Sequence, residues 1–197
     1  MIKRIFDITF SFLGLILISF LLLAIAFLIK RESPGPVFYR GERIGKNGKP
    51  FRIFKFRSMV MNADKIGGPS TSADDPRLLK IGKFLRRYQL DELPQFINIF
   101  RGEMSFVGPR PEVPSEVERY DEETKKIILS VKPGLTDLAT LEDVHEEEIL
   151  RGAKDPHEAY RRLIQPKKLA LAKEYVKNRS FWLDIKIILK TLKSAIF

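Results

Sequence analysis

Two neighbouring acids with cationic residues on both sides form the part of the sequence best suited to chemistry. Asp91 and Glu92 lie just ahead of Pro94, Arg86 precedes them, and Arg110 stands between two prolines further on. Carboxylates hold Mg²⁺ together with substrate phosphates, and a carboxylate can also attack phosphorus to form an acyl phosphate. Arginines bind phosphates through paired hydrogen bonds. These residue types therefore predict a site for a phosphorylated substrate and a divalent cation.

A strand, a turn and a second strand are predicted ahead of these acids, over residues 37–59. The dipeptide Asn47-Gly48 is a signal for a hairpin turn, and apolar runs flank it. If the second strand is regular, Lys55 and Arg57 project from the same face, because alternate residues of a strand do so. We therefore add both cations to the candidate phosphate site.

Helices are predicted on both sides of the acids. Apolar residues recur at helical spacing from Leu78 to Tyr88, and Pro94 is suited to open a helix that runs from Gln95 to Phe100 and stops at Gly102. Acids at the start of a helix are often no more than caps, and this alternative stays open for the pair. Elsewhere the pattern predicts a loop over residues 61–76 and charged helices over residues 115–129 and 155–175.

The first thirty residues contain an apolar segment long enough for a membrane. No charged residue occurs between Ile8 and Ile29. A helix rising about 1.5 Å per residue over this length can cross a hydrocarbon core of about 30 Å. A signal peptide is an alternative, since residues 24–26 resemble a cleavage site, but the apolar run continues beyond them. A buried core helix is another, although so small a chain has little protein to cover it. We favour a membrane segment.

The charges around this segment bear on its topology. Basic residues lie at both ends, at positions 3–4 and 30–31, which suits a helix that enters and leaves on one face, with a full span as the alternative. Most basic residues follow the segment, so the rest of the chain is expected on the cytoplasmic side. We therefore expect a membrane-embedded helix over residues 1–31 and a cytoplasmic, membrane-associated catalytic domain over residues 32–197.

The last predicted helix is amphipathic. Its apolar residues fall on one face, at Phe181, Ile185, Ile188, Leu192 and Ile196, and lysines occupy the other face, at Lys186, Lys190 and Lys193. This pattern is typical of a helix lying in a membrane interface, and a surface helix packed on a core shows it as well. Taken with the segments above, it predicts an α+β fold that is mainly helical. The fold would have a re-entrant or spanning N-terminal membrane helix, a small β-hairpin and interfacial amphipathic helices.

Composition narrows the choice of partners. The chain has 35 Lys and Arg against 25 Asp and Glu, a net charge of +10, which indicates nucleic acid, a membrane surface or a phosphorylated substrate. There is no Cys, which excludes disulfides and thiolate chemistry, and the two histidines, His145 and His157, are expected in exposed stretches without metal-ligand spacing.

Three other functions stay open beside phosphate transfer to an acceptor. A membrane-tethered nucleic-acid-binding protein is suggested by the sequence RIFKFR, but it gives no reason for two acids among arginines. No nucleic-acid partner is therefore expected. A membrane scaffold whose acids only cap a helix, and a Mg²⁺-dependent enzyme that passes the phosphoryl group to water, are the remaining alternatives.

Four segments in a fixed order carry a resemblance to a known family. They are the apolar N-terminal segment, SPGPVFYRGERIGKNGKPFRIFKFRSM, LRRYQLDELPQFINIFRGEMSFVGPRP and VKPGLTDLA. Together they cover nearly the whole chain, and the sequence resembles the monotopic phosphoglycosyl transferases, bacterial sugar transferases that start glycan assembly on a lipid carrier. The resemblance implies an enzyme of the bacterial inner membrane whose catalytic domain lies on the cytoplasmic face.

The resemblance also implies a role for each acid. Asp91 would attack the sugar-linked phosphorus of a UDP-sugar and release UMP, and Glu92 would hold the Mg²⁺ that bridges the diphosphate. Polyprenyl (undecaprenyl) phosphate would then take the sugar phosphate from Asp91. The cationic candidates would bind the substrate: Arg86 through a phosphate, Arg110 through the nucleotide or its phosphates, and Lys55 and Arg57 from the same pocket wall.

The sequence departs from the family at two places. Many members have Ser-Pro within the N-terminal segment, where this chain has Ser19-Phe20. Ser19 is then the residue that remains to bend a re-entrant helix. Asp137 and Thr140 occupy positions where many relatives carry Gly and Gln, in a region that the resemblance places near the nucleotide-sugar. The sequence therefore leaves the donor sugar open, and the acidic residues 146–148 are interpreted as a solvated helix, with a lid as the alternative.

Overall fold

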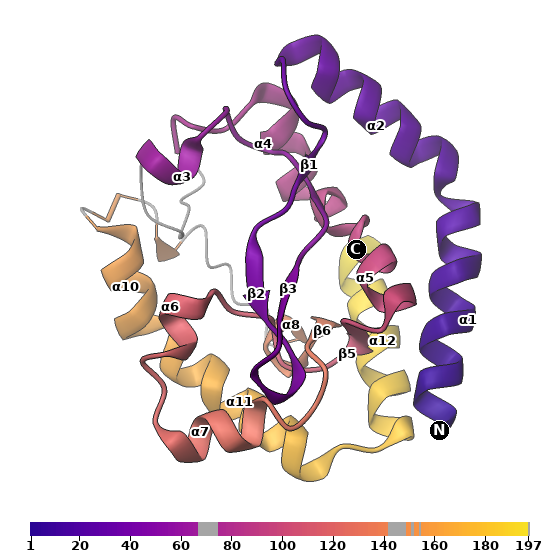
Figure 1. Ribbon diagram of the computed structural model, residues 1–197, viewed down its shortest axis with the longest axis vertical. Helices are drawn as coiled ribbons and strands as arrows, with labels where there is room; N and C mark the ends of the chain where they lie inside the picture. Colours follow the sequence, from indigo (N-terminus) through magenta and orange to yellow (C-terminus); the bar gives the residue numbers. More distant parts are fainter. Residues whose placement is uncertain (67–74, 142–148, 151, 154, 197) are drawn as a thin grey trace.

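The computed structural model describes residues 1–66, 75–141, 149–150, 152–153 and 155–196. Over these residues the protein is mainly helical, with three two-stranded sheets (Figure 1). The expected fold class, mainly helical α+β with a small β-hairpin, is confirmed to that extent. In Figure 1 the first two helices run along one side of the molecule, the hairpin lies in the middle, and α6, α7 and α10 lie on the other side.

The helices are α1 (Ile2–Leu17), α2 (Ser19–Glu32), α3 (Ala63–Ile66), α4 (Lys80–Arg87), α5 (Gln95–Arg101), α6 (Pro114–Val117), α7 (Glu122–Ile128), α8 (Leu138–Leu141), α10 (Pro156–Leu163), α11 (Gln165–Asn178) and α12 (Phe181–Ile196). The strands are β1 (Phe38–Tyr39), β2 (Glu42–Ile44), β3 (Pro50–Arg52), β4 (Lys55–Phe56), β5 (Ser105–Val107) and β6 (Gly134–Thr136). Two single 3₁₀ turns are η1 (Lys46–Gly48) and η2 (Leu90–Glu92).

The N-terminal apolar segment folds as two helices that meet at a bend of 61°. The break is at Ile18, and the hydroxyl of Ser19 donates a hydrogen bond to the Ile16 carbonyl oxygen at 2.8 Å. A serine that bonds back to the preceding turn competes with the helical ladder and bends the helix. The bend therefore forms without proline, next to the serine that the sequence indicated.

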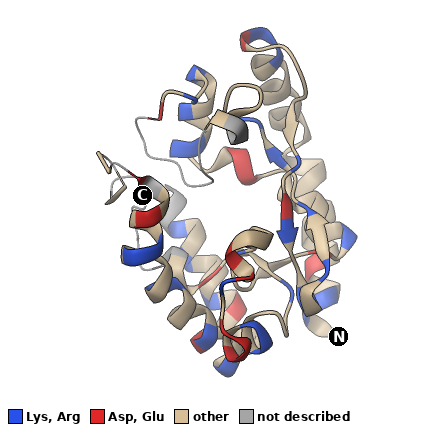
Figure 2. Ribbon diagram, turned by 60° about the vertical axis from the view of Figure 1, so that its left-hand side comes forward, with Lys and Arg blue, Asp and Glu red and all other residues tan. Residues whose placement is uncertain are grey.

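The two helices differ from a single membrane span. Within the described ranges no one helix is both long and apolar enough to cross a bilayer, and α1 with α2 meets that requirement only as a bent pair. Their outward side chains are strongly exposed, with Leu17 and Phe20 at 83% and 84%. Figure 2 shows both helices free of charged residues over most of their length. Whether the pair re-enters or spans stays a prediction.

Helix α1 is fastened to the rest of the protein near its start. It packs along α5, where a Cβ added at Gly14 would lie 2.5 Å from the ring of Phe96. The buried carboxylate of Asp7 accepts hydrogen bonds from the Ser105 hydroxyl and the Phe106 amide, each at 3.1 Å. These contacts join the apolar helix directly to β5.

A second buried acid holds α12 against α1. Asp184 accepts from the Lys3 ammonium and from the Tyr175 hydroxyl, each at 2.6 Å, and is 5% exposed. Lys3 also donates to the Val107 carbonyl oxygen at 2.9 Å, so α1 contacts both ends of β5. A buried carboxylate needs such partners because an unpaired charge in the interior is strongly destabilising.

Helix α12 contains the predicted apolar stripe, and the members of that stripe differ in their exposure. Asp184 and Ile187 are buried, Ile188 of the stripe packs against the core beside Val107, and Leu192 further along the stripe is 55% exposed. Trp182 and Leu189 are exposed as well. The hydrogen bonds of Asp184 help to fix which side of the helix packs against the protein. Its place in a membrane interface stays a prediction.

The hairpin is confirmed, and its ladder is interrupted. Strand β2 pairs antiparallel with β3, and β1 pairs antiparallel with β4, with Phe38 opposite Phe56. Asn47 adopts a left-handed conformation with φ of +58° in the turn, which Asn tolerates better than most residues. Between the two ladders, the amide of Phe54 donates its hydrogen bond to a side chain rather than to the opposite strand.

That side chain belongs to Asn98, which joins α5 to the hairpin. Its Oδ1 accepts from the Phe54 amide at 2.8 Å, and its Nδ2 donates to the Arg52 carbonyl oxygen at 3.0 Å and to Glu103 at 2.7 Å. The side chain is fully buried. Because α5 follows the acidic pair and Phe54 precedes Lys55, this one amide fixes the distance between the acids and the hairpin.

Two predicted helices are each broken into two. The segment 115–129 forms α6, which ends at Val117, and α7, whose start Asp121 caps by accepting from the Thr124 amide at 2.7 Å. The segment 155–175 forms α10 and α11, which meet at Ile164 just before Pro166, a residue that cannot donate to the preceding turn.

The predicted loop at 61–76 contains the short helix α3, and residues 67–74 lie outside the described residues.

A buried acid links the two broken regions. Glu116 of α6 is 2% exposed and accepts from Arg161, and from Gln165 at 2.9 Å, with His157 Nε2 at 3.2 Å. His157, expected in an exposed stretch, is only partly exposed, because its ring packs against this carboxylate. His145, the acidic residues 146–148 and the side chain of Thr140 lie outside the described part of the structure.

We expect Asn98→Ala to destabilise the fold strongly. It removes three hydrogen bonds and leaves the buried Phe54 amide without its acceptor, which costs about 2–4 kcal/mol of unfolding free energy. Urea denaturation of the purified protein in detergent measures this. Asn178→Ala, at the exposed end of α11, is the control, with an expected change within about 0.5 kcal/mol. Equal losses in both variants would contradict the role given to Asn98.

Candidate active site

The acidic pair lies in a tight turn between α4 and α5. Gln89 adopts a left-handed conformation with φ of +54°, after which η2 carries Asp91 and Glu92. Asp91 is 9% exposed, so the pair faces the interior. The start of α5 receives no side-chain cap. The interpretation of these acids as simple caps of that helix is therefore wrong, and their burial needs another reason.

Glu92 is the centre of a compact ion-pair network. Its Oε1 accepts from Lys55 Nζ of the hairpin and from Arg110 Nη2 of the Gly-Pro-Arg-Pro loop, each at 2.7 Å. Burial acts to raise the pKa of Glu92, but the charges of Arg110 and Lys55 outweigh it and bring this pKa well below its ordinary value. Burial also lowers the pKa of Lys55, against the opposing charge of Glu92. The glutamate is therefore held in its ionised form.

Asp91 has the opposite environment, although it is the next residue. It accepts no hydrogen bond from any side chain or amide of the described ranges. Burial raises its pKa to about 6, with the negative charge of Glu92 adding to the rise and the charge of Lys55 opposing it. A carboxylate that makes no hydrogen bond keeps its oxygens available for reaction. The two neighbouring acids are thus suited to different tasks.

The cationic candidates separate into two groups. Arg86, in the last turn of α4, and Arg110 both lie close enough for their charges to lower the pKa of Asp91. Arg57 is elsewhere: it donates to the carbonyl oxygens of Ser33 at 2.8 Å and Pro34 at 2.7 Å, behind α2. Strand β4 ends before Arg57, so the alternation that placed it beside Lys55 does not continue. The structure brings five of the six predicted site residues together.

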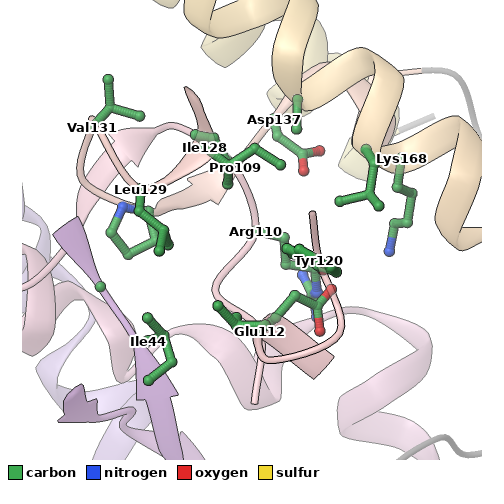
Figure 3. A pocket seen from close by; sticks show the side chains of 15 residues that line it. Ile44, Pro109, Arg110, Glu112, Tyr120, Ile128, Leu129, Val131, Asp137 and Lys168 are labelled. Carbon is green, nitrogen blue, oxygen red and sulfur yellow. The ribbon is translucent and has the colours of Figure 1, made fainter. Parts of the chain in front are cut away.

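A pocket adjoins this network on the side of Arg110 (Figure 3). Its polar lining includes Arg110, Tyr120, Asp137 and Lys168, which Figure 3 shows on the walls of one cavity. Apolar walls come from β2, α7, α11 and the segment before β6, at Ile44, Ile128, Leu129, Val131, Pro133, Leu169 and Ala172. Arg110 therefore belongs both to the acidic network and to the pocket.

Sequence reasoning missed several residues of this region. Asn98 sets the position of the acids, and Tyr120 and Lys168 line the pocket, but none was a candidate. Asn98 lies on the short helix α5 that directly follows the acids, and this proximity in sequence is a local signal that was available. Lys168 is far from Arg110 in sequence, and only the packing of α11 on α7 brings it near. Local patterns give no signal of such a contact.

The side chains near the acidic pair indicate what kind of metal site is possible. Within the described ranges no three His, Cys, Asp or Glu side chains gather as a metal cage. Two adjacent carboxylates do lie together, and Glu92 uses only Oε1 for its two cationic partners. Mg²⁺ is commonly held by one or two carboxylates together with substrate phosphates. The acidic pair fits that arrangement, and a metal held by protein side chains alone does not fit.

Comparison with known proteins adds to this geometry. The chain is 43% identical over 195 residues to a UDP-glucose:undecaprenyl-phosphate glucose-1-phosphate transferase of Escherichia coli strain K12, covering 98% of this chain and 39% of that protein. It is 37% identical over 202 residues to a UDP-N-acetylgalactosamine-undecaprenyl-phosphate N-acetylgalactosaminephosphotransferase of Aeromonas hydrophila, covering 99% and 44%. The exopolysaccharide production protein ExoY of Sinorhizobium fredii is 38% identical over 208 residues, covering 98% and 84%.

The chain spans about two fifths of the length of the first two relatives. The match to the family described as bacterial sugar transferase extends over residues 1–197 and includes both acids, the hairpin and the Gly-Pro-Arg-Pro loop. On this match, and on relatives aligned over nearly all of its residues, the chain belongs to the bacterial sugar transferase family.

Proposed function

We propose that this protein transfers a sugar 1-phosphate from a UDP-sugar to polyprenyl (undecaprenyl) phosphate through a covalent phosphosugar-aspartate intermediate. The observation that carries the proposal is the pairing of two unlike acids: Asp91, buried and without a hydrogen bond, beside Glu92, ionised and held by Lys55 and Arg110. The names of the relatives support the substrates, since they include UDP-sugars and undecaprenyl phosphate.

In the first step a carboxylate oxygen of Asp91 attacks the sugar-linked phosphorus of the donor. The bond between this phosphorus and the bridging oxygen breaks, and UMP leaves with the electron pair. Arg86 and Arg110 lie where their positive charge reduces the repulsion between the anionic carboxylate and the anionic diphosphate.

In the second step a phosphate oxygen of the polyprenyl acceptor attacks the same phosphorus. The bond from phosphorus to Asp91 breaks, which regenerates the carboxylate and yields polyprenyl diphosphate-sugar. Donor and acceptor thus use one site in turn, so a soluble and a lipid substrate need not bind together. If water took the place of the lipid in this second step, the enzyme would be a hydrolase, and its first step would be the same.

A divalent cation belongs to the proposal as a bound partner of the diphosphate. Glu92, and the donor phosphates with it, would hold Mg²⁺, which when bound neutralises phosphate charge. Asp91 is left to act on phosphorus. In the absence of substrate, Lys55 and Arg110 balance the charge of Glu92.

The apolar helix pair explains how a lipid acceptor would reach the reaction site. We place α1 and α2 in the cytoplasmic leaflet of the bacterial inner membrane as a re-entrant pair, with the remaining domain on the cytoplasmic face. The bend of 61° and the strongly exposed apolar side chains of both helices support this placement. The helix that packs on α1 is α5, which begins directly after the acids, so the reaction site is held close to the lipid.

Asp91→Asn tests the nucleophile. With a UDP-sugar, Mg²⁺ and no acceptor, the wild type should release one equivalent of UMP and gain the mass of a phosphosugar. The amide variant should release UMP at least about a thousandfold more slowly and gain no mass. Quenched-flow analysis of UMP and intact-protein mass spectrometry measure both. Glu118→Gln, an exposed acid beyond α6, is the matched control. Equal UMP release by the wild type and Asp91→Asn would overturn the covalent mechanism.

The rate of UMP release should rise with pH through about 6, because the attacking carboxyl of Asp91 has its pKa raised to about 6 and reacts only when ionised. Lys55→Met removes a charge that lowers this pKa, so the midpoint should move upward by about one pH unit. Single-turnover rates from pH 4.5 to 8.5 show this shift. Lys49→Met, on the exposed hairpin, should leave the midpoint unchanged. A midpoint that stays fixed in Lys55→Met would contradict the assignment to Asp91.

Single cysteines test the placement of the helix pair, since the chain has no Cys of its own. Ile2→Cys and Arg31→Cys should both react with a membrane-impermeant maleimide in inverted membrane vesicles, and neither should react in spheroplasts. Leu17→Cys, next to the bend, should be protected in both. Glu118→Cys marks the cytoplasmic side. Labelling of positions 2 and 31 from opposite sides would show a full span instead.

A further inference from the structure

Gln95 carries a buried amide nitrogen that has no hydrogen-bond acceptor within the described part of the chain. The residue is 2% exposed, and no described group accepts from its Nε2. Burying an N–H group without a partner is unfavourable, so such groups are uncommon in folded proteins and often mark a catalytic role. Packing alone therefore does not account for this glutamine, because an apolar side chain of similar size would fill the same space at less cost.

Gln95 lies one helical turn beyond the two acids. The backbone stays right-handed helical from η2 through residues 93 and 94 into α5, which begins at Gln95. Residues three and four apart on a helix are neighbours, with about 5–6 Å between their Cβ atoms. Helical side chains lean toward the N-terminal end of the helix, so the amide of Gln95 leans back toward the acids.

The inner face of this helical stretch is turned toward the hairpin. Asp91, Gln95 and Asn98 follow one another on that face at helical spacing, and all three are buried. Asn98 accepts from the Phe54 amide, and η2 contacts the strand β4, which begins with Lys55. The face thus carries a carboxyl group, the Gln95 amide and an amide that is already bonded to the hairpin.

Of the two acids, Asp91 is the one that needs a donor. Glu92 accepts from Lys55 and Arg110, whereas no side chain or amide among the described residues donates to Asp91. A buried acceptor without a donor and a buried donor without an acceptor therefore lie one turn apart. Gln and Asp side chains at this spacing form hydrogen bonds on helices, and a change of side-chain torsions is enough to join them.

We propose that Gln95 is a positioning residue for Asp91, whose Nε2 donates to one carboxylate oxygen while the other attacks phosphorus. The inference rests on the proposed function, which makes Asp91 the nucleophile. In the first step the hydrogen bond fixes the rotation of the carboxylate, so that a lone pair of the second oxygen points at phosphorus. In the second step the bond from phosphorus to Asp91 breaks, its electron pair returns to the carboxylate, and the same N–H stabilises the returning charge.

Gln95→Met tests the amide, because methionine has a similar size and no donor. With a saturating UDP-sugar, Mg²⁺ and no acceptor, single-turnover UMP release should be about ten- to a hundredfold slower than in the wild type. The donor concentration at half-maximal rate should stay within about twofold, because the hydrogen bond acts on Asp91 and not on the bound donor. Transfer of the phosphosugar from Asp91 to polyprenyl phosphate should slow as well. Quenched-flow analysis of the detergent-solubilised full chain measures both steps.

Stability separates this role from a structural one. The thermal unfolding midpoint of Gln95→Met should equal or exceed that of the wild type, because the substitution removes an unpartnered buried amide. Gln165→Met is the matched control, since Gln165 Nε2 already donates to the buried Glu116 at 2.9 Å. That variant should unfold at a lower temperature and release UMP at the wild-type rate. Gln95→Leu, which also lacks a donor, carries the test if Gln95→Met does not fold.

The wild type distinguishes failure of this inference from failure of the proposed function. If the wild type gains the mass of a phosphosugar but folded Gln95→Met releases UMP within twofold of the wild-type rate, only the role given to Gln95 is overturned. If the wild type neither releases UMP from UDP-sugars nor gains mass, the proposed function fails, and the role of Gln95 fails with it.

Discussion

The carboxylate of Glu92, shared between Lys55 and Arg110, is the interaction on which the geometry of the site depends. It joins three segments that are far apart in the sequence: the hairpin, the turn before α5 and the Gly-Pro-Arg-Pro loop. Removing one partner from such a buried network leaves an uncompensated charge, which is strongly unfavourable. The arrangement therefore holds the loop and the hairpin against the acids before any substrate arrives.

The same network makes two neighbouring acids unlike each other. Both cations bond to Glu92, so Asp91 is left buried with only their more distant charge. The pKa of Glu92 falls and that of Asp91 rises. Environments that separate the pKa values of two carboxyl groups in this way let proteins give different tasks to chemically identical side chains. In the proposed reaction the ionised acid serves the phosphates, and the acid without a hydrogen bond serves as nucleophile.

The sequence predicted the acids, the hairpin and α5 because each has a local signal. Asn47-Gly48 marks the turn, and Pro94 and Gly102 mark the ends of the helix. Prediction failed where tertiary contacts override local patterns. Arg57 was placed by strand alternation that stops at Phe56, after which the carbonyl oxygens behind α2 bind its side chain.

Two helix breaks were also missed. Single helices were predicted through Asp121 and through Pro166, although a capping residue and a proline are both signals for a break. Those two breaks were readable from the sequence, whereas the proximity of Lys168 to Arg110 was not.

The attachment of α1 to β5 connects the apolar helix to the reacting residues. Asp7 bonds to the start of β5 and Lys3 to its end, and the chain then runs directly into the loop that carries Arg110. Helix α1 also packs along α5, which follows the acids. Two of the segments that supply the site are thus fixed to the helix that is proposed to lie in the membrane.

In the proposed reaction, this construction would give the two substrates different routes to one phosphorus atom. The pocket beyond Arg110 is lined by β2, α7 and α11 among other segments, and none of these three belongs to the apolar pair. The acids lie at the start of the helix that contacts α1, where an acceptor confined to the bilayer would present its phosphate. The covalent aspartate intermediate of the proposed mechanism fits this arrangement, because it would let the nucleotide leave before the lipid phosphate takes its place.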